Sequence, residues 1–221
     1  MKQSRLSLLL ALTLAAAAPA MASDDISKVN GSISAEAGRQ YRDLETVNGS
    51  ITVAAGVQAR NVETVNGGVR IGDNAQVRNV ETVNGSIRLG RGVVGSGGLE
   101  TVNGSVFVDQ GSRIAGGVET VNGSIGLVGT QLGKGIETVN GDITVGVGSQ
   151  VQGGIRVKKS GFSLSLKPPR TPRVIVGPDA VVEGPLEFER EVTLYVHRSA
   201  KIGPVTGATV QTFDTDTAPR D

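Results

Sequence analysis

The residues with the greatest chemical capacity are six glutamates that recur at nearly constant spacing. Each begins the pentapeptide Glu-Thr-Val-Asn-Gly, and successive copies start 18 or 19 residues apart, at Glu45, Glu63, Glu81, Glu100, Glu119 and Glu137. Carboxylates brought together could bind hard divalent cations. Two of them could also act as the acid and the nucleophile of a glycoside hydrolase, provided that their environments differ. The repetition gives all six the same surroundings, which favours a solvated acidic face, with bridging cations as the alternative.

Composition excludes several kinds of catalytic and metal site. The chain has 221 residues with one His, no Cys and 32 Gly. Without Cys there is no disulfide framework, thiolate metal site or Cys nucleophile. A single His rules out a multi-His metal centre and argues against a His-dependent triad. We therefore expect no enzyme activity and no cofactor.

The first 22 residues have the pattern of a signal peptide. Lys2 and Arg5 precede an apolar run over residues 6–18, and Ala20-Met21-Ala22 fits the small-x-small cleavage rule. No second apolar segment follows, so no transmembrane segment is expected in the mature chain. Taking these two cations from the 22 basic residues leaves 20 against 21 acidic ones, a net charge of −1. The sequence thus predicts an exported protein, periplasmic or at the bacterial cell surface, that does not bind nucleic acid.

The elements that would position the glutamates are short strands. One repeat contains three apolar alternations, over residues 62–65, 69–71 and 75–77, which predicts an all-β fold with three strands per 18–19-residue coil. Asn-Gly between apolar residues is also typical of hairpins, so an antiparallel meander is the alternative. A parallel β-solenoid is favoured because it stacks equivalent residues about 4.8 Å apart and gives a reason to repeat Glu, Thr and Val.

The Asn-Gly pairs are predicted to form the corners of the coils. Stacked Asn amides can hydrogen-bond in a ladder, and Gly can supply a positive φ at a tight corner. Asn-Gly-Ser also matches the N-glycosylation pattern, but Asn66 and Asn140 lack the Ser and a ladder Asn would face inward. The predicted corner residues are Asn48, Gly49, Asn66, Gly67, Asn84, Gly85, Asn103, Gly104, Asn122, Gly123, Asn140 and Gly141.

Period-2 alternation predicts which side chains of the repeat face outward. Val62 and Thr64 would lie inside, and Glu63 and Val65 outside. A contiguous apolar stripe on a surface usually marks an interaction site. The alternative is a kink near the Thr that turns every Val inward. With the glutamates, the candidate interaction surface contains Val47, Val65, Val83, Val102, Val121 and Val139.

The regular block is predicted to span residues 23–157 and to be followed by an insertion over 158–172. Pro168, Pro169 and Pro172 are incompatible with a ladder strand. Diverged coils follow over 173–211, and then a polar tail over 212–221. A candidate patch for an anionic partner lies around the insertion: Arg156, Lys158, Lys159, Lys167, Arg170 and Arg173. The alternative is neutralisation within the chain by Glu183, Glu187, Glu189 and Glu191.

The repeated Val-Glu-Thr-Val-Asn-Gly-Ser-Ile pattern over about residues 28–157 resembles the DUF4097 family of bacterial adhesin-type β-repeat proteins. The pattern over residues 176–205 is similar to that of the bactofilins, which are polymer-forming β-helix proteins. Both resemblances imply a β-solenoid and neither implies a catalytic residue. The signal peptide departs from cytoplasmic bactofilins, which argues against a cytoskeletal role.

These observations together predict a non-catalytic, exported β-solenoid. Its repetitive surface would serve adhesion, envelope structure or self-assembly. The expected partner is the chain itself, by end-to-end or lateral association, or an envelope or glycan surface. The alternative is a lectin-like or polysaccharide-active β-helix protein.

Overall fold

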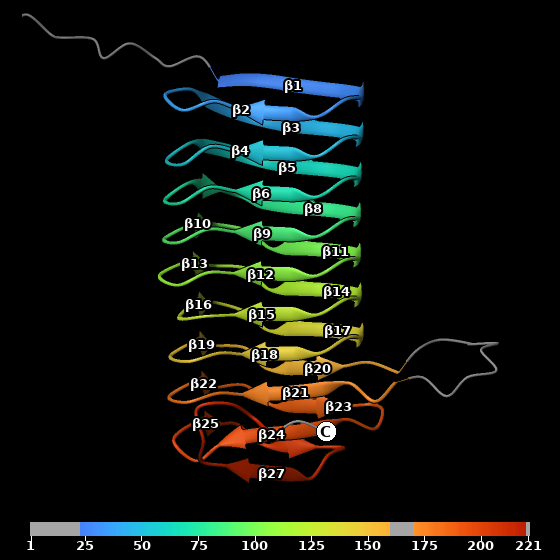
Figure 1. Cartoon of the computed structure of the whole chain (residues 1–221), viewed down its shortest axis with the longest axis vertical. Helices are drawn as coiled ribbons and strands as arrows, with labels where there is room; N and C mark the ends of the chain where they lie inside the picture. The colour runs from blue at the N-terminus through green and yellow to red at the C-terminus, as the bar shows by residue number, and fades with distance from the viewer. Residues whose placement is uncertain (1–22, 160–169, 220–221) are drawn as a thin grey trace, which may run out of the picture.

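A computed structural model describes residues 23–159 and 170–219. These residues contain 27 short strands and no helix. Every strand pairing among them is parallel. The chain winds into a stack of coils in which each strand lies above its equivalent in the next coil (Figure 1). The predicted β-solenoid is confirmed, and the antiparallel meander is wrong.

The strands of the described residues fall into three columns, each containing the equivalent strand of successive coils. The first column carries the Glu-Thr-Val-Asn repeat and comprises β1 (Ser23–Asn30), β3 (Gln40–Asn48), β5 (Gln58–Asn66), β8 (Asn79–Asn84), β11 (Leu99–Asn103), β14 (Val118–Asn122), β17 (Ile136–Asn140), β20 (Ile155–Val157), β23 (Leu186–Phe188) and β26 (Val205–Thr206). The second comprises β2 (Ile33–Ala35), β4 (Ile51–Val53), β6 (Val69–Ile71), β9 (Ile87–Leu89), β12 (Val106–Val108), β15 (Ile125–Leu127), β18 (Ile143–Val145), β21 (Arg173–Val176), β24 (Thr193–His197) and β27 (Val210–Phe213). The third comprises β7 (Gln76–Val77), β10 (Val94–Gly95), β13 (Arg113–Ile114), β16 (Gln131–Leu132), β19 (Gln150–Val151), β22 (Val181–Val182) and β25 (Lys201–Ile202).

Two sheets result from these three columns. The second column forms a 10-stranded sheet, one strand per coil of the described chain. The first and third columns join into a 17-stranded sheet because β5 pairs with both β7 and β8. In β3 and β5 the third strand of one coil continues directly into the first strand of the next. Later coils interrupt this run, at Arg78 between β7 and β8 and at short glycine-containing segments such as Ser96-Gly97-Gly98 between β10 and β11.

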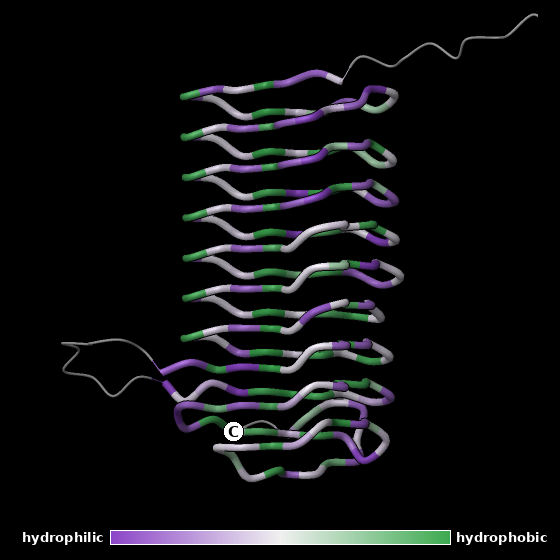
Figure 2. The backbone as a smooth tube through the Cα atoms, turned by 180° about the vertical axis from the view of Figure 1, so that it is seen from behind, coloured by the Kyte–Doolittle hydropathy of each residue, from purple (hydrophilic) through white to green (hydrophobic). Residues whose placement is uncertain are grey.

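The core lies inside the coils and is filled by alternating apolar side chains. In β4, Ile51 and Val53 are buried while Thr52 is exposed, and the same pattern repeats in β6 and β9. Figure 2 shows the result as apolar segments that recur at the same place in successive coils. Large and small residues also exchange places between coils: the register of β5 on β7 sets buried Val57 against Ala75 and Ala59 against Val77. This layering keeps the thin interior filled.

The Asn-Gly corners are tight for a different reason from the one expected. Among the Asn-Gly pairs only Gly31 has a positive φ, of 108°. The others are glycine because each corner lies against the corner of the preceding coil, so that a Cβ on Gly85 would overlap the carbonyl oxygen of Gly67. Positive φ angles recur instead at the turn before the third strand, at Gly38, Gly56, Asn74, Gly92, Gly111, Gly129, Gly148 and Asp179.

The described strands bear on two of the predicted segment ends. β20 ends at Val157, and the next strand, β21, begins at Arg173 and stacks on β18. Most of the expected insertion, residues 160–169, lies outside the described residues. The polar tail begins later than expected. Thr212 and Phe213 belong to β27, and buried Phe213 contacts the His197 ring edge-on at 5.1 Å. Residues 1–22, the expected signal peptide, lie outside the described residues.

Among those described, no helix has the length and apolar character needed to cross a membrane.

Candidate functional site

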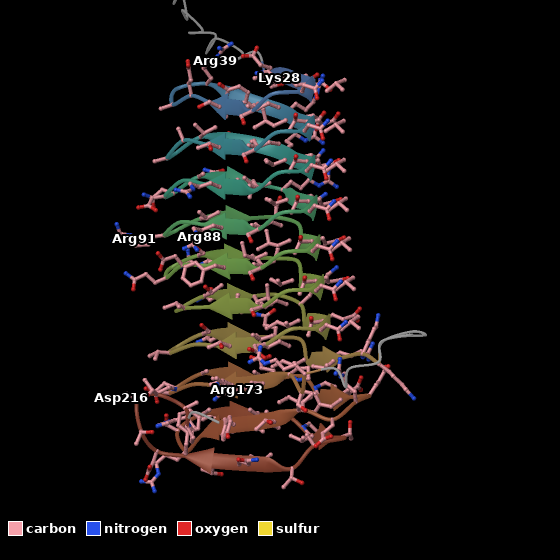
Figure 3. All side chains as sticks on the ribbon, turned by 45° about the vertical axis from the view of Figure 1, so that its right-hand side comes forward. Lys28, Arg39, Arg88, Arg91, Arg173 and Asp216 are labelled. Atoms are coloured by element: carbon pink, nitrogen blue, oxygen red, sulfur yellow. The ribbon has the colours of Figure 1, made fainter. Side chains whose placement is uncertain are left out.

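The first column of strands displays the repeat in register over six coils. Glu45, Glu63 and Glu81 are direct partners in neighbouring strands, and the same register continues through Glu100, Glu119 and Glu137. Side chains of equivalent residues therefore stand one above another along the stack (Figure 3). Glu and Val point outward and Thr points inward, as alternation predicted. Five of the valines, Val47, Val65, Val83, Val102 and Val121, are 39–41% exposed.

A long groove runs along the solenoid between the glutamate and valine columns. Its volume is about 620 Å³, and the threonines line its floor. Ser27 and Lys28 lie at its N-terminal end and Lys158 at its C-terminal end. One wall is acidic and the other apolar, and both repeat once per coil. We call it the Glu/Val groove.

Buried threonines hold the floor of this groove in place. The hydroxyl of Thr82 donates a hydrogen bond to the carbonyl oxygen of Gly67, at 2.9 Å. Thr46, Thr64, Thr101 and Thr120 make the equivalent bond at 2.8–3.2 Å. Each bond ties the middle of a strand to the corner of the preceding coil. Thr138 is the exception, because its buried hydroxyl has no hydrogen-bond partner among the described residues.

The acidic wall carries unrelieved charge in its middle. The pKa values of Glu63, Glu81 and Glu119 are raised, first because partial burial desolvates the carboxylates and then because neighbouring glutamates repel them. The column ends at a cation: Arg156 occupies the register position of Glu137 in the next coil, and its Nε donates to Glu187 at 2.9 Å. Lys158 forms an ion pair with Glu137. Glu137 is thus the one glutamate of the column with an ion pair among the described residues, and Lys134 and Lys158 partly offset the repulsion at Glu119.

The predicted asparagine ladder is confirmed. Each Asn Nδ2 donates to the Oδ1 of the Asn in the preceding coil at 2.9–3.0 Å, from Asn48 on Asn30 to Asn140 on Asn122. The ladder lies at the surface, so the expectation of inward-facing Asn side chains is wrong. Arg190 closes its C-terminal end by donating from Nη1 to Asn140 Oδ1 and to the Val139 carbonyl. Sequence reasoning missed Arg190, because nothing local marks a partner 50 residues away.

The predicted basic patch is largely paired with acids of the same chain. Besides Arg156 and Lys158, Arg170 forms an ion pair with Asp142 at 2.9 Å. The backbone of Lys159 donates to Glu189 at 3.2 Å, and the Arg173 guanidinium lies 5.3 Å from the Tyr195 ring centre. Lys167 lies outside the described residues. The arrangement favours neutralisation within the chain. Glu137, Asp142 and Glu187 form the ion pairs with the patch, and of the four glutamates expected to do so only Glu187 does among the described residues.

A second groove, which the sequence did not suggest, follows the other side of the glutamate column. Its volume is about 530 Å³. Its floor is glycine-rich, and Glu100, Glu119, Glu137, Lys134 and Arg156 line its sides. The sequence does carry a signal for this groove: Arg78-Asn79 occupies this corner in one coil, and Gly-Gly pairs such as Gly97-Gly98 replace it in later coils. The glutamates therefore form a ridge between two grooves.

The described residues contain no cluster of three or more His, Cys, Asp or Glu side chains placed to hold a metal ion. The stacked glutamates thus lie in a row and do not converge on a point. Comparison of the chain with protein-family models, curated proteins and solved structures found no match.

Proposed function

We propose that the protein is an exported, non-catalytic scaffold that presents a repetitive surface for adhesion, envelope structure or self-assembly. The observation that carries the proposal is the outward placement of one Glu and one Val, in register, in each of six consecutive coils, of which the last, with Val139, is half-buried. Export rests on the predicted signal peptide over residues 1–22, and the resemblance to adhesin-type repeats points the same way.

The arrangement of acids supports binding over catalysis. Hydrolysis of a glycosidic bond needs two carboxylates with different pKa values on opposite sides of a scissile bond. The pKa values of Glu63, Glu81 and Glu119 instead shift in the same direction, raised first by partial burial and then by repulsion from neighbouring glutamates. A row of equivalent groups suits many weak, repeated contacts, whose combined strength exceeds that of any one.

A lectin-like role is the second candidate, and the glycine-floored groove favours it. A floor without side chains lets a flat ligand approach the backbone closely, and Glu119, Lys134 and Arg156 offer hydrogen-bonding groups at its sides. A glycan array probed with residues 23–221 tests it. Binding lost on Glu119→Gln with Lys134→Ala would support this role, and an array without signal would remove it.

The main proposal is tested by binding of residues 23–221 to bacterial cell-envelope fractions. The triple variant Val65→Ser, Val83→Ser, Val102→Ser removes the apolar wall of the Glu/Val groove. A matched control changes three exposed valines outside this groove, Val94, Val128 and Val147, to serine. Loss of binding in the groove variant alone supports the proposal. Equal binding by both variants, or no binding by the unchanged chain, contradicts a role of this surface in adhesion or envelope structure.

A further inference from the structure

The Glu/Val groove has the chemistry of a receptor for long cationic side chains. Lys and Arg carry an apolar stem and a charged head, so a stem can lie on the Val wall while the head reaches the Glu wall. The chain contains one such arrangement already. Arg156 is the register partner of Glu137, so Lys158, two residues later, occupies the position of the valine column. The ammonium group of Lys158 forms an ion pair with Glu137.

Filling the rest of the groove requires cations repeated at the spacing of the coils, about 4.8 Å. Another solenoid column has that spacing by construction. A helix repeats every 5.4 Å and drifts out of step along the groove, and alternate residues of an extended strand lie about 6.6 Å apart and drift faster. The best match is therefore a column of arginines on a stacked β-fold.

This chain has such a column beside its third strands. Arg60 and Arg78 are in register, and the Arg78 backbone N–H donates to the Arg60 carbonyl at 2.8 Å. Both side chains are exposed, and neither has an acidic partner among the described residues. The equivalent cation of the preceding coil differs, because Arg42 forms ion pairs with Asp25 and Asp43. On the second sheet, Arg88 lies over the Phe107 ring at 5.2 Å.

We propose that a second copy of this chain docks side by side on the Glu/Val groove. Arg60 and Arg78 of each copy enter the groove of the other and pair with Glu63 and Glu81. Arg60 and Glu63 belong to the same coil, as do Arg78 and Glu81, so a twofold axis parallel to the solenoid would bring both pairs to matching heights in both copies. The arginine stems would cover Val65 and Val83. This inference rests on the proposed function, since it names the partner of the same surface.

The experiment measures self-association of residues 23–221 by analytical ultracentrifugation over a concentration and salt series. The acid-face variant is Glu63→Arg, Glu81→Arg, and the arginine variant is Arg60→Glu, Arg78→Glu. Each alone sets like charges against each other and should weaken dimerisation by about tenfold or more. Mixed in equal amounts, the two variants should associate again, because each supplies the charges that the other lacks. The control Arg70→Glu, Arg88→Glu makes the same charge change on the second sheet and should dimerise like the unchanged chain.

Circular dichroism of each variant verifies that the coils are intact, and the mixing step excludes misfolding as the cause of lost association. A chain that stays monomeric at every concentration and salt overturns the inference, as does a mixture that fails to associate or a control that loses dimerisation. If the monomer still binds envelope fractions in a Val-dependent way, the inference fails while the proposed function stands. A dimer lost on the charge reversals and restored on mixing establishes the docking surface, whatever the envelope assay shows.

Discussion

Arg190 Nη1 donates a hydrogen bond to the side-chain oxygen of Asn140, at 2.5 Å, although the two residues lie 50 positions apart. The six amide-to-amide bonds of the ladder all run toward the N-terminus, so the last Asn has an acceptor left over. Arg190 uses that acceptor and also binds the carbonyls of Val139 and Arg170. A residue of the diverged C-terminal coils thereby satisfies the hydrogen-bond acceptor left at the end of the asparagine ladder.

Replacing Arg190 with Ala should lower the free energy of unfolding by about 1.5–3 kcal/mol, the range for hydrogen bonds to charged groups. Arg198→Ala is the matched control, since Arg198 is exposed and lies 3.8 Å from Asp214, and its loss should change the free energy by less than about 1 kcal/mol. Urea denaturation of both variants measures the difference. Equal midpoints for the two would show that the contact with Asn140 contributes nothing to stability.

The paired and unpaired threonines should respond oppositely to the same substitution. Thr82→Val keeps the shape but leaves the Gly67 carbonyl without its donor, at a cost of about 1–3 kcal/mol. Thr138→Val removes a buried hydroxyl that has no partner, so it should be neutral or stabilising. Thermal denaturation followed by circular dichroism compares them. A destabilised Thr138→Val variant would mean that its hydroxyl is hydrogen-bonded in solution.

Glycines at the two kinds of corner should differ in their tolerance of alanine. At Gly85 the Cβ would overlap the backbone of Gly67, and neither stacked corner can move away, so the loss should exceed about 3 kcal/mol. At Gly56 the space is open and only the positive φ of 70° opposes the change, which costs about 1–2 kcal/mol. Chemical denaturation ranks the two. The reverse order would contradict close packing at the Asn-Gly corners.

The stability of the folded chain should increase as the pH falls from 7 toward 4.5, the ordinary pKa of a Glu side chain. Folding raises the pKa values of Glu63, Glu81 and Glu119, so the folded state binds protons more tightly than the unfolded state. Their destabilising effect is present above the raised pKa and is lost as the pH falls through it toward 4.5.

The triple variant Glu63→Gln, Glu81→Gln, Glu119→Gln isolates this effect from that of other carboxylates. It should be more stable than the unchanged chain at pH 7, and the difference should shrink as the pH approaches 4.5. Melting temperatures across this range provide the measurement. A difference that stays constant with pH would contradict mutual repulsion and desolvation as the cause.

Much of the fold could be predicted from two patterns. The repeat indicates how many residues make one coil, and the alternation indicates which side chains face the core. Glu63 and Val65 lie outward for the simple reason that Val62 and Thr64 face the core. Other features depend on contacts between coils. The reason for glycine at position 85 is the backbone of the preceding coil. The pairing of Lys158 with Glu137 and of Arg190 with Asn140 depends on how the insertion and the diverged coils return to the stack. No local pattern encodes such contacts.

The ladder keeps its register whether successive asparagines are 18 residues apart, as from Asn66 to Asn84, or 19, as from Asn84 to Asn103. The distance along the solenoid axis therefore depends on the number of coils and does not change when a turn gains or loses one residue. Equivalent side chains are separated along the axis by whole multiples of the height of one coil. Duplication or deletion of one coil would change the length by about 4.8 Å. It would also add or remove one Glu, one Val and one Asn, and the spacing between the remaining repeated side chains would stay the same.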